Sequence, residues 1–362
     1  MLSASVAMIL LLSYPNTSVD MKRKKVYIQA AEQISIQEPL SEHWIEEPLF
    51  YKERLVKAIN PPFREYIAPN EARRMGNIMK RALVTAMKVL KETGIEHPDA
   101  IITGTSIGSL EYTEKFLGAM LASHEEALSP TFFIQSTQNT VGSALGIHTK
   151  SHGYNITYSH GSISFELAMQ DAWMQLQLGK IKNALVGGHD EMVESYFELL
   201  KKTEYVGLDN MVPCGEVAVS MMLNTQPSDS DLCELVGLRI FHDPKLISIE
   251  HILSSMLNDA SMQYEDISAI MTGVNGNPAN DQYYDTVINK LFPNIPVIHY
   301  KYLFGENYTA SALGVYAAAN YLKHNLIEGS DAKIYNKSPK SILLLNHMNG
   351  TEYSMVLLRS CC

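Results

Sequence analysis

The 362-residue sequence contains few cysteines, and this scarcity limits what the chain can be. The four cysteines lie at positions 214, 233, 361 and 362 and do not form two pairs with metal-ligand spacing, so we expect no metal site. A low cysteine content is typical of a reducing compartment, and we therefore expect a cytoplasmic protein. A lipid on Cys361 or Cys362 is an alternative, but we expect an exposed terminal pair without a function.

Positive charge is also scarce. The chain has 29 Lys and Arg residues against 39 Asp and Glu residues, for a formal net charge of −10. Nucleic-acid-binding proteins usually carry a clustered basic surface, and the Lys/Arg-rich run of this chain is confined to Lys22–Lys25. We therefore expect no nucleic-acid partner.

Long apolar runs are absent as well. Met8–Leu12 is apolar, but it is too short to span a membrane. A signal peptide has a Lys or Arg before its apolar stretch, and no such residue precedes Met8. Met21–Lys25 precedes the strand-like Val26–Ile28 and resembles a natural start. We expect residues 1–20 to be a non-native start, with a weak secretion signal as the alternative.

Periodic apolar residues predict an α/β organisation in the first part of the chain. Residues 71–91 carry apolar side chains at helical spacing before Gly94, and Ala100–Ile102 is a short apolar run that predicts a buried strand. Ser162–Leu178 is apolar nearly all round and ends at Gly179. This pattern predicts a helix buried on all faces.

The second part repeats these patterns. We expect helices over Ile249–Leu257 and Thr309–Leu322, and strands over Ile267–Met271, Ser341–Leu345 and Tyr353–Leu358, with a turn at Asn346–Thr351. The Pro/Ser/Asp-rich stretch Gln226–Asp231 predicts a boundary between two halves. Helices that alternate with buried strands indicate a mixed, largely parallel sheet covered on both sides.

Several motifs, in their order and spacing, resemble those of the β-ketoacyl-(acyl carrier protein) synthases. The motifs that carry this resemblance are Ser129–Thr137 with Asn139 and Gly142–Gly146, Asn155–Ser162, Gly179, Gly187–Gly188, Gly215–Ala218 with Glu234–Gly237, Gly276–Asp281, Pro296–Val297, Lys301, Gly305, and Ala310–Gly314. The resemblance implies an α/β, thiolase-like, five-layered α-β-α-β-α fold of two pseudo-duplicated halves, 21–225 and 226–362, in one compact body. It implies no cofactor.

Three positions depart from the family where its chemistry is carried. Ser162, Gly273 and Glu306 stand where the family has a nucleophilic cysteine and two histidines. A serine hydroxyl needs a neighbouring general base before it attacks. Gly273 has no side chain to donate to an oxyanion, and an ionised Glu306 only accepts hydrogen bonds and repels an enolate. Decarboxylative condensation therefore lacks its usual groups.

Ser162 has two possible roles. It is either acylated with help from His160 or another histidine, or it is the N-cap of the buried helix, and we favour the cap.

Polar residues around the other two positions suggest a rebuilt network. We expect Lys301 to pair with Glu306 or another acid. Asn275 and Asn277 near Gly273, and His299 and Asn307 near Glu306, are candidates for the same network. The loop Asn346–Thr351 is reduced from the family's Gly-rich, Phe-containing gate, and we expect His189, Asp190 and Cys214 to be structural.

A ketosynthase body without its catalytic residues resembles the chain length factors. The resemblance implies a non-catalytic partner of an active β-ketoacyl synthase in fatty acid, polyketide or aryl-polyene-like biosynthesis. The implied tunnel or dimer-interface residues are Phe132, Phe133, Gln135, Asn139 and Val141.

Three alternatives to this interpretation stay open. They are a Ser162-dependent acyltransferase or ketosynthase-like enzyme, a stand-alone acyl-chain binder, and a homodimer in place of the heterodimer. Acyl carrier protein is a further candidate partner. The negative net charge weakens its docking without excluding a local basic patch.

Overall fold

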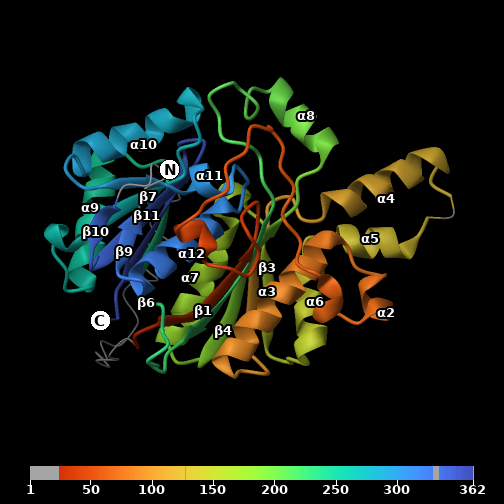
Figure 1. The fold of residues 1–362 in the computed structure, drawn as a ribbon, viewed down its shortest axis with the longest axis horizontal. Coiled ribbons are helices and arrows are strands. Elements are labelled where there is room, and N and C mark those ends of the chain that lie inside the picture. Colours follow the sequence, from red (N-terminus) through yellow and green to blue (C-terminus); the bar gives the residue numbers. More distant parts are fainter. Residues whose placement is uncertain (1–23, 127, 329–333, 362) are drawn as a thin grey trace, which may run out of the picture.

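The computed structural model describes residues 24–126, 128–328 and 334–361 (Figure 1). The expected non-native start at residues 1–20 and the last cysteine, at position 362, lie outside the described residues.

Strands and helices alternate through the first part of the chain. Their bounds are β1 (Tyr27–Ile34), α2 (Pro69–Ala72), α3 (Asn77–Thr93), β2 (Ala100–Gly104), α4 (Leu110–Ala122), α5 (Pro130–Ser136), α6 (Thr140–Thr149), β3 (Tyr154–Tyr158), α7 (Ser164–Gln177), β4 (Asn183–Asp190), α8 (Glu194–Lys202) and β5 (Val217–Asn224).

The second part repeats the alternation. Its elements are β6 (Cys233–His242), α9 (Leu246–Asp259), β7 (Ala269–Thr272), α10 (Pro278–Leu291), β8 (Val297–His299), α11 (Tyr300–Phe304), α12 (Ala310–Lys323), β9 (Leu326–Glu328), β10 (Ile334–Lys337), β11 (Ser341–Met348) and β12 (Glu352–Arg359).

The large sheet contains the same strand order twice. Its ten strands run β3-β2-β4-β5-β1-β6-β12-β11-β7-β8. The order β3-β2-β4-β5-β1, read from one edge, matches β8-β7-β11-β12-β6, read from the other. Parallel and antiparallel pairs also correspond, since β2 is parallel to β3 and β4 just as β7 is parallel to β8 and β11. The pseudo-duplication expected from the resemblance is confirmed. We propose the boundary between the halves in the β5–β6 connection, at residues 225 and 226.

The layers follow from three buried apolar clusters. One cluster joins α7 and α12 to the inner faces of strands from both halves. A second packs α3 and α6 on the outer face of β1, β2, β4 and β5. A third packs α9 and α10 on the outer face of β7, β11 and β12. The result is the five-layered, thiolase-like α-β-α-β-α arrangement.

Two predicted boundaries were wrong. The helix predicted from residue 71 begins at Asn77, because the extended backbone of Gly76 separates it from the short α2. Strand β11 continues to Met348 through the predicted turn, because its antiparallel ladder with β12 continues to that residue. The turn is confined to residues 349–351, of which Asn349 and Gly350 have φ of 52° and 69°.

Helix α7 is not buried on every face, contrary to the prediction from its sequence. Met174 and Leu178 are 46% and 54% exposed. The carboxylates of Glu166 and Asp171, by contrast, are buried in it. Gly179 ends the helix with a φ of 67°, as predicted.

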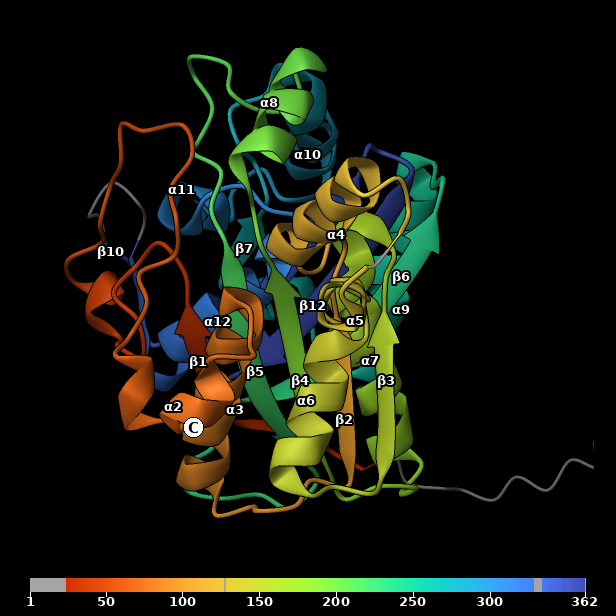
Figure 2. The same ribbon diagram turned by 90° about the vertical axis from the view of Figure 1, so that its right-hand side faces the viewer.

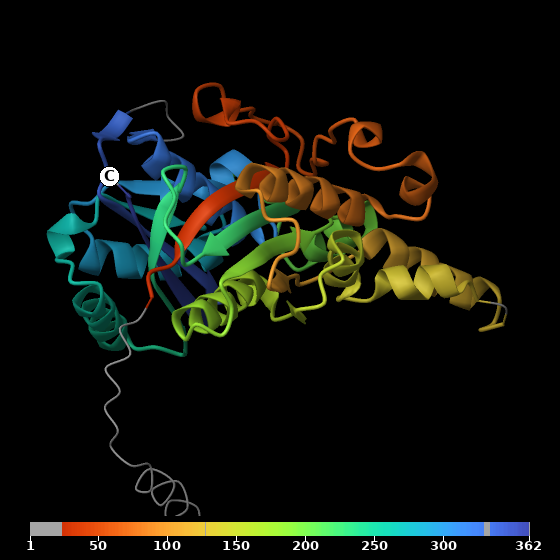
Figure 3. The ribbon, with the colours of Figure 1, turned by 90° about the horizontal axis from the view of Figure 1, so that it is seen from below.

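Helices α4 and α5 form an arm that projects from the rest of the molecule (Figures 1 and 3). Leu110 is the buried residue of α4, and Gln135 that of α5. The two helices pack on each other through the ring pairs Tyr112–Phe132 and Phe116–Phe133. The arm therefore has few contacts with the core of its own chain.

Candidate functional site

The three departing positions follow the edge strand β3, strand β7 and helix α11. Ser162 lies in a 3₁₀ turn, η3 (Gly161–Ile163), between β3 and α7. Gly273 directly follows β7, and Glu306 follows α11. Polar side chains connect the three positions, so the structure brings together what the sequence separates.

Ser162 is not the N-cap of α7, contrary to our prediction. The cap position is Ile163, without a side-chain hydrogen bond, because the η3 turn precedes the helix. The hydroxyl of Ser164 fastens this turn: it accepts from the His160 amide at 2.7 Å and donates to the Gly161 carbonyl at 2.7 Å.

The backbone N–H and the backbone carbonyl of Ser162 both have hydrogen-bond partners. Its N–H donates to Met348 Sδ at 3.4 Å, and its carbonyl accepts from Asn346 Nδ2 at 2.8 Å. A Cβ added at Gly161 would lie 2.1 Å from Met348 Sδ, so this methionine packs directly on the turn. A backbone N–H at this position is the kind of donor that stabilises an oxyanion, and here Met348 covers it.

No histidine is placed to activate Ser162 in the described part of the chain. His160 Nε2 instead pairs with Glu352 Oε1 at 2.8 Å, and its side chain is half exposed. The ring of His347 interacts with the Asn280 carbonyl through Nε2 and accepts from the Gly350 amide at Nδ1. Burial lowers the pKa of His347 to about 3, so the ring is neutral.

Two tyrosines fill the space beside Gly273. A Cβ built on this glycine would lie 2.5 Å from the hydroxyl of Tyr284 and 2.7 Å from that of Tyr300. Both distances are below van der Waals contact, so the packing that surrounds Gly273 leaves no room for an imidazole. The two hydroxyls donate to Asn346 Oδ1 at 3.1 and 3.4 Å.

Lys301 pairs with Glu306, as predicted. Its Nζ lies 3.0 Å from Glu306 Oε1 and 2.9 Å from Oε2, and both residues are buried. Asn275 Nδ2 donates to the same Oε2 at 2.5 Å. Glu306 thus has both of its oxygens satisfied by its own chain, and its charge is balanced.

The side chains of the other predicted network residues hydrogen-bond elsewhere, although the Asn277 amide donates to Asn275 Oδ1 at 2.9 Å. Asn277 caps α10 by accepting from the Ala279 amide, Asn307 donates to the Gly215 carbonyl, and the His299 ring bonds Thr272. Of these four described candidates, Asn275 is the one whose side chain hydrogen-bonds Glu306.

Cys214 lies beside this site, because its backbone forms an isolated β-bridge with the backbone of Glu306. Burial, followed by the Glu306 carboxylate, raises the pKa of its thiol. A thiol with a raised pKa is a poor nucleophile, in agreement with a structural role.

A buried carboxyl, Glu166, lies one turn beyond Ser162. It accepts from Asn346 Nδ2 at 2.7 Å and from the hydroxyls of Ser354 and Ser311, each at 2.9 Å. Burial raises the pKa of Glu166, and the hydrogen bonds oppose that rise. Glu166 and Asn346 therefore tie α7 to α12, β11 and β12 beneath the η3 turn.

Sequence reasoning missed the side chains that close the site. Tyr284 lies one helical turn after the retained Asn280–Asp281 motif, and Tyr300 directly precedes Lys301. The sequence signal for this was a glycine at the position of a histidine together with two tyrosines in the neighbouring motifs. This combination indicates that larger side chains fill the space that the smaller residue leaves.

The predicted polar core residues are confirmed as such. Asp190 is buried and accepts from the Thr105 hydroxyl and from the amides of Ser106, Ile107 and Gly108. His189 is also buried. Across residues 24–126, 128–328 and 334–361, no group of three His, Cys, Asp or Glu residues is arranged to hold a metal ion.

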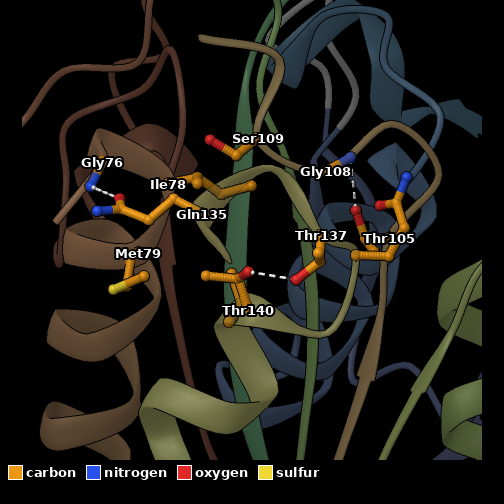
Figure 4. A pocket seen from close by; sticks show the side chains of 11 residues that line it. Gly76, Ile78, Met79, Thr105, Gly108, Ser109, Gln135, Thr137 and Thr140 are labelled. Carbon is orange, nitrogen blue, oxygen red and sulfur yellow. Dashed lines mark hydrogen bonds between the residues drawn. The ribbon is translucent and has the colours of Figure 1, made fainter. Parts of the chain in front are cut away.

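The five predicted interface residues divide into two sets. Phe132, Phe133 and Asn139 are partly or fully exposed, whereas Gln135 and Val141 are buried. Gln135 Oε1 accepts from the Gly76 amide (Figure 4). Its Nε2 donates to the Arg74 carbonyl. Gln135 and Val141 line a cavity of about 10 Å³, the size of one water molecule. Gln135 thus holds the arm to the segment before α3, Val141 of α6 packs in the buried cluster with α3, and neither forms an exposed surface.

Comparisons with known proteins agree with this architecture. No curated protein sequence matches the chain. Among solved structures, the ishigamide ketosynthase/chain length factor has 18% sequence identity and a TM-score of 0.78, covering 94% of this chain and 100% of that one. The ketosynthase ApeO in complex with its chain length factor ApeC from Xenorhabdus doucetiae has 16% identity and a TM-score of 0.77, covering 93% and 98%.

A β-ketoacyl synthase from Burkholderia phymatum STM815 has 14% identity and a TM-score of 0.76, covering 94% of this chain and 100% of that one. At these identities the similarity establishes the fold.

In the described part of the chain, no helix combines the length and apolarity needed to cross a membrane. The family described as β-ketoacyl synthase, N-terminal domain, matches residues 43–238, which is more than half of the sequence. The chain belongs to the β-ketoacyl synthase family.

Proposed function

We propose that the chain is a non-catalytic, ketosynthase-like subunit of the chain length factor type, which pairs with an active β-ketoacyl synthase in fatty acid, polyketide or aryl-polyene-like biosynthesis. The observation that carries this proposal is the filled space at Gly273, where the hydroxyls of Tyr284 and Tyr300 lie within 2.7 Å of the missing Cβ. A second catalytic side chain cannot be placed there without rebuilding the core.

The chemistry of the remaining groups supports the same proposal. Condensation needs a nucleophile to hold the acyl chain and donors to stabilise an enolate. Here the Ser162 amide is covered by Met348, and Glu306 is an acceptor paired with Lys301. Neither group is free to bind a reacting oxygen.

The serine-dependent alternative lacks a base. His160, the nearest histidine in the sequence, is directed at Glu352, at the surface. The acyl-binding alternative needs an apolar cavity, typically of several hundred Å³. Hollows of about 790, 630, 580 and 430 Å³ lie elsewhere on the described part of the chain, and Ser162, Gly273 and Glu306 line none of these four. The cavity beside Gln135 has room for about one water molecule. We therefore prefer the subunit role to both.

The apolar surface of the chain is unevenly distributed. Of the 15 large apolar side chains that are exposed among the described residues, seven lie on α4, α5, α6, β3 and α7, and an eighth, Leu178, is the C-cap of α7. They are Leu117, Leu121, Phe133, Ile134, Ile147, Tyr154, Met174 and Leu178. These elements lie on the β3 side of the sheet (Figure 2). An apolar surface concentrated on one side, including an arm with few contacts of its own, is typical of a protein interface.

Strand β3 adds a second feature to this side, because it is the last strand of the sheet. Its outer backbone groups have no strand partner among the described residues, and such an edge is a template for pairing with another chain. We name the surface formed by α4, α5, α6, β3 and the exposed face of α7 the β3-side surface.

Co-expression with a complete Cys-His-His ketosynthase from a neighbouring gene tests the proposal. We expect a 1:1 complex in size-exclusion chromatography with light scattering, and condensation of acyl and malonyl carrier-protein thioesters only by the complex. The chain alone should show no turnover. Turnover by the chain alone that Ser162→Ala abolishes would establish the enzyme alternative in its place. Binding of isolated acyl carrier protein to each subunit separately then shows which of them docks it.

A further inference from the structure

The loops that precede β2, β3 and β4 surround a hollow at the amino ends of these strands. Because β2 is parallel to both β3 and β4, the three loops lie at the same end of the sheet, the lower end in Figure 2. The hollow has a volume of about 580 Å³ and is lined by residues 97–99, 150–153 and 179–182. This volume is typical of small-molecule sites. We name it the amino-end hollow.

Hydrogen bonds hold the three loops together. The Asp99 carbonyl accepts from the Tyr154 amide at 3.2 Å, and the Asp99 carboxylate accepts from the Lys182 amide at 2.8 Å. The Ser151 hydroxyl donates to the Pro98 carbonyl at 2.5 Å. Each loop is thus bonded to another, so a ligand would meet a rim that is already ordered and would bind without the cost of ordering it.

The amino-end hollow is positively charged, although the net charge of the whole chain is −10. Lys150, Lys180 and Lys182 line it and are exposed, and Asp99 is the acid among its lining residues. Its formal charge is therefore +2 with its histidines neutral. The three lysines have no ion-pair partner among the described residues. Like charges that lie together without a counter-charge repel one another, so the cluster indicates an anion that the chain does not supply.

Helix ends account for a part of this charge. Lys24 Nζ lies 3.1 Å from a Cβ built on Gly179, which lines the hollow, and raises the formal charge to +3. Lys150 is the C-cap of α6, and Lys180 follows the glycine that ends α7. A helix carries about half a negative charge at its carboxyl end, where a lysine is favourable. The ends of α6 and α7 together offset about one unit, so about +2 is left.

The second half of the chain contains an equivalent hollow for comparison. Strands β7, β8 and β11 correspond to β2, β3 and β4 in the duplicated order, and the hollow at their amino ends has a volume of about 790 Å³. Lys290, Lys340 and Glu265 line it, and Lys340 pairs with Asp266 at 3.3 Å. Its two lysines are thus matched by two acids. The fold therefore does not require an excess of lysines at this position.

The lining of the amino-end hollow indicates the kind of anion. Lysine is a compact point charge that binds phosphate groups, and a cleft lined by one sign of charge concentrates ions of the other sign. No Phe, Tyr or Trp lines the hollow to stack on a base. Recognition would therefore depend on the charge of the ligand.

We propose that the amino-end hollow binds a multiply charged phosphate group, carried by a soluble small molecule or by the head group of an anionic lipid. The inference is independent of the proposed function, because Ser162, Gly273 and Glu306 do not line this hollow.

Calorimetric titration of the full chain with pyrophosphate at constant ionic strength tests the inference. We expect saturable binding by the wild-type chain and a Kd at least tenfold higher for Lys150→Gln/Lys182→Gln. Lys290→Gln/Lys340→Gln removes the same charge from the equivalent hollow of the second half and is the matched control, with an unchanged Kd. No saturable binding by the wild-type chain, or the same Kd in the two double variants, contradicts the inference.

Thermal unfolding separates lost binding from lost folding. Without pyrophosphate, Lys150→Gln/Lys182→Gln should be at least as stable as the wild-type chain, because it removes repulsion between like charges. Pyrophosphate should raise the Tm of the wild-type chain and of the control variant, since a ligand that binds the folded state stabilises it. An equal rise in Lys150→Gln/Lys182→Gln would place the binding site elsewhere.

Two further ligands identify the source of the phosphate. Competition of ATP with pyrophosphate would indicate a soluble ligand, whereas co-sedimentation with phosphatidylglycerol vesicles, and not with phosphatidylcholine vesicles, would indicate a lipid. Either interaction should be lost in Lys150→Gln/Lys182→Gln. Poly-glutamate that displaces pyrophosphate at lower concentrations than ATP does would overturn the inference, because the hollow would then select the carboxylates of an acidic protein.

Discussion

At the scale of single residues, Asn346 holds the closed site together. Its Oδ1 accepts from Tyr284 and Tyr300, and its Nδ2 donates to the Ser162 carbonyl and to Glu166. Buried amide networks in which every group is satisfied are rigid and specify one arrangement. Asn346 therefore couples the filled Gly273 position to the covered Ser162 turn.

The two serines of the η3 turn should differ in importance. Ser164→Ala removes two hydrogen bonds that fasten the turn and should cost about 1 kcal/mol of unfolding free energy, as for a lost cap. Ser162→Ala removes neither bond and should change stability by less, with product formation by the ketosynthase complex unchanged. Urea unfolding of the two variants checks the difference. A larger loss of stability in Ser162→Ala would show that its hydroxyl has a structural role beyond these contacts.

The Lys301–Glu306 pair should behave as a coupled unit. Lys301→Met leaves a buried carboxylate without its cation and should cost about 3–5 kcal/mol. The double variant Lys301→Met/Glu306→Gln removes both charges and should recover most of that loss, since a buried pair often contributes little net stability. A double-mutant cycle by chemical denaturation measures the coupling. Additive losses would show that the two groups act independently.

Glu32 should make stability depend on pH. Burial raises its pKa from 4.5 to about 7, against an opposing effect of Lys88, and its side chain is only 13% exposed. Because the folded pKa is above the unfolded value, the folded state binds more protons. This contribution to stability is complete below pH 4.5 and is lost as the pH rises to about 7.

Glu32→Gln should therefore raise the unfolding free energy at pH 8 by about 3 kcal/mol and leave it nearly unchanged at pH 4.5. Unfolding in urea at the two pH values measures both differences. Glu53→Gln, on the exposed side of the β1–α3 connection, is the control. An equal gain from Glu32→Gln at both pH values would contradict the assignment.

At the scale of elements, periodicity predicted the helices and strands better than their ends. The α7 and α12 patterns identified the two helices of the central layer, since a helix with apolar residues on most faces is typically buried between layers. The start of α3 and the end of β11 depend on one glycine and on a ladder with a distant strand, which a local pattern does not contain. The exposed face of α7 was missed for a similar reason, because Met174 and Leu178 are apolar whether or not the chain itself covers them.

The arm formed by α4 and α5 should determine assembly without determining folding. Phe133 and Ile134 are 55% and 61% exposed, so Phe133→Asp and Ile134→Asp should leave the chain folded and dissociate the ketosynthase complex, since an unpaired charge in an interface core is costly. Val141→Asp places the charge in the buried cluster beneath the arm and should unfold the chain instead. Circular dichroism and size analysis separate the two outcomes. An intact complex in both arm variants would show that the interface with the ketosynthase does not include the arm of the β3-side surface.

At the scale of the whole molecule, the two halves share one core. The central apolar cluster contains residues of α7 and β5 from the first half together with α12 and β11 from the second. Strands β1 and β6 also pair across the boundary, at Tyr27–Glu234 and Ile28–Cys233. The duplicated topology therefore repeats a pattern without making two independent domains.

The first half alone should not fold as a unit. A fragment of residues 24–225 would expose the inner faces of its sheet and of α7 that α12 and β11 cover in the full chain, and exposed apolar surface of this extent favours aggregation. Trp44, in the first half, packs against Phe304, Tyr316 and Tyr321 of the second, so its fluorescence reports the junction between the halves. In the full chain we expect tryptophan fluorescence and far-UV circular dichroism to change in one coincident urea transition. The fragment should show no cooperative transition unless residues 226–362 are co-expressed with it. A soluble fragment with a sharp thermal transition of its own would mean that the halves are separate domains, and that the central core contributes less to stability than its composition indicates.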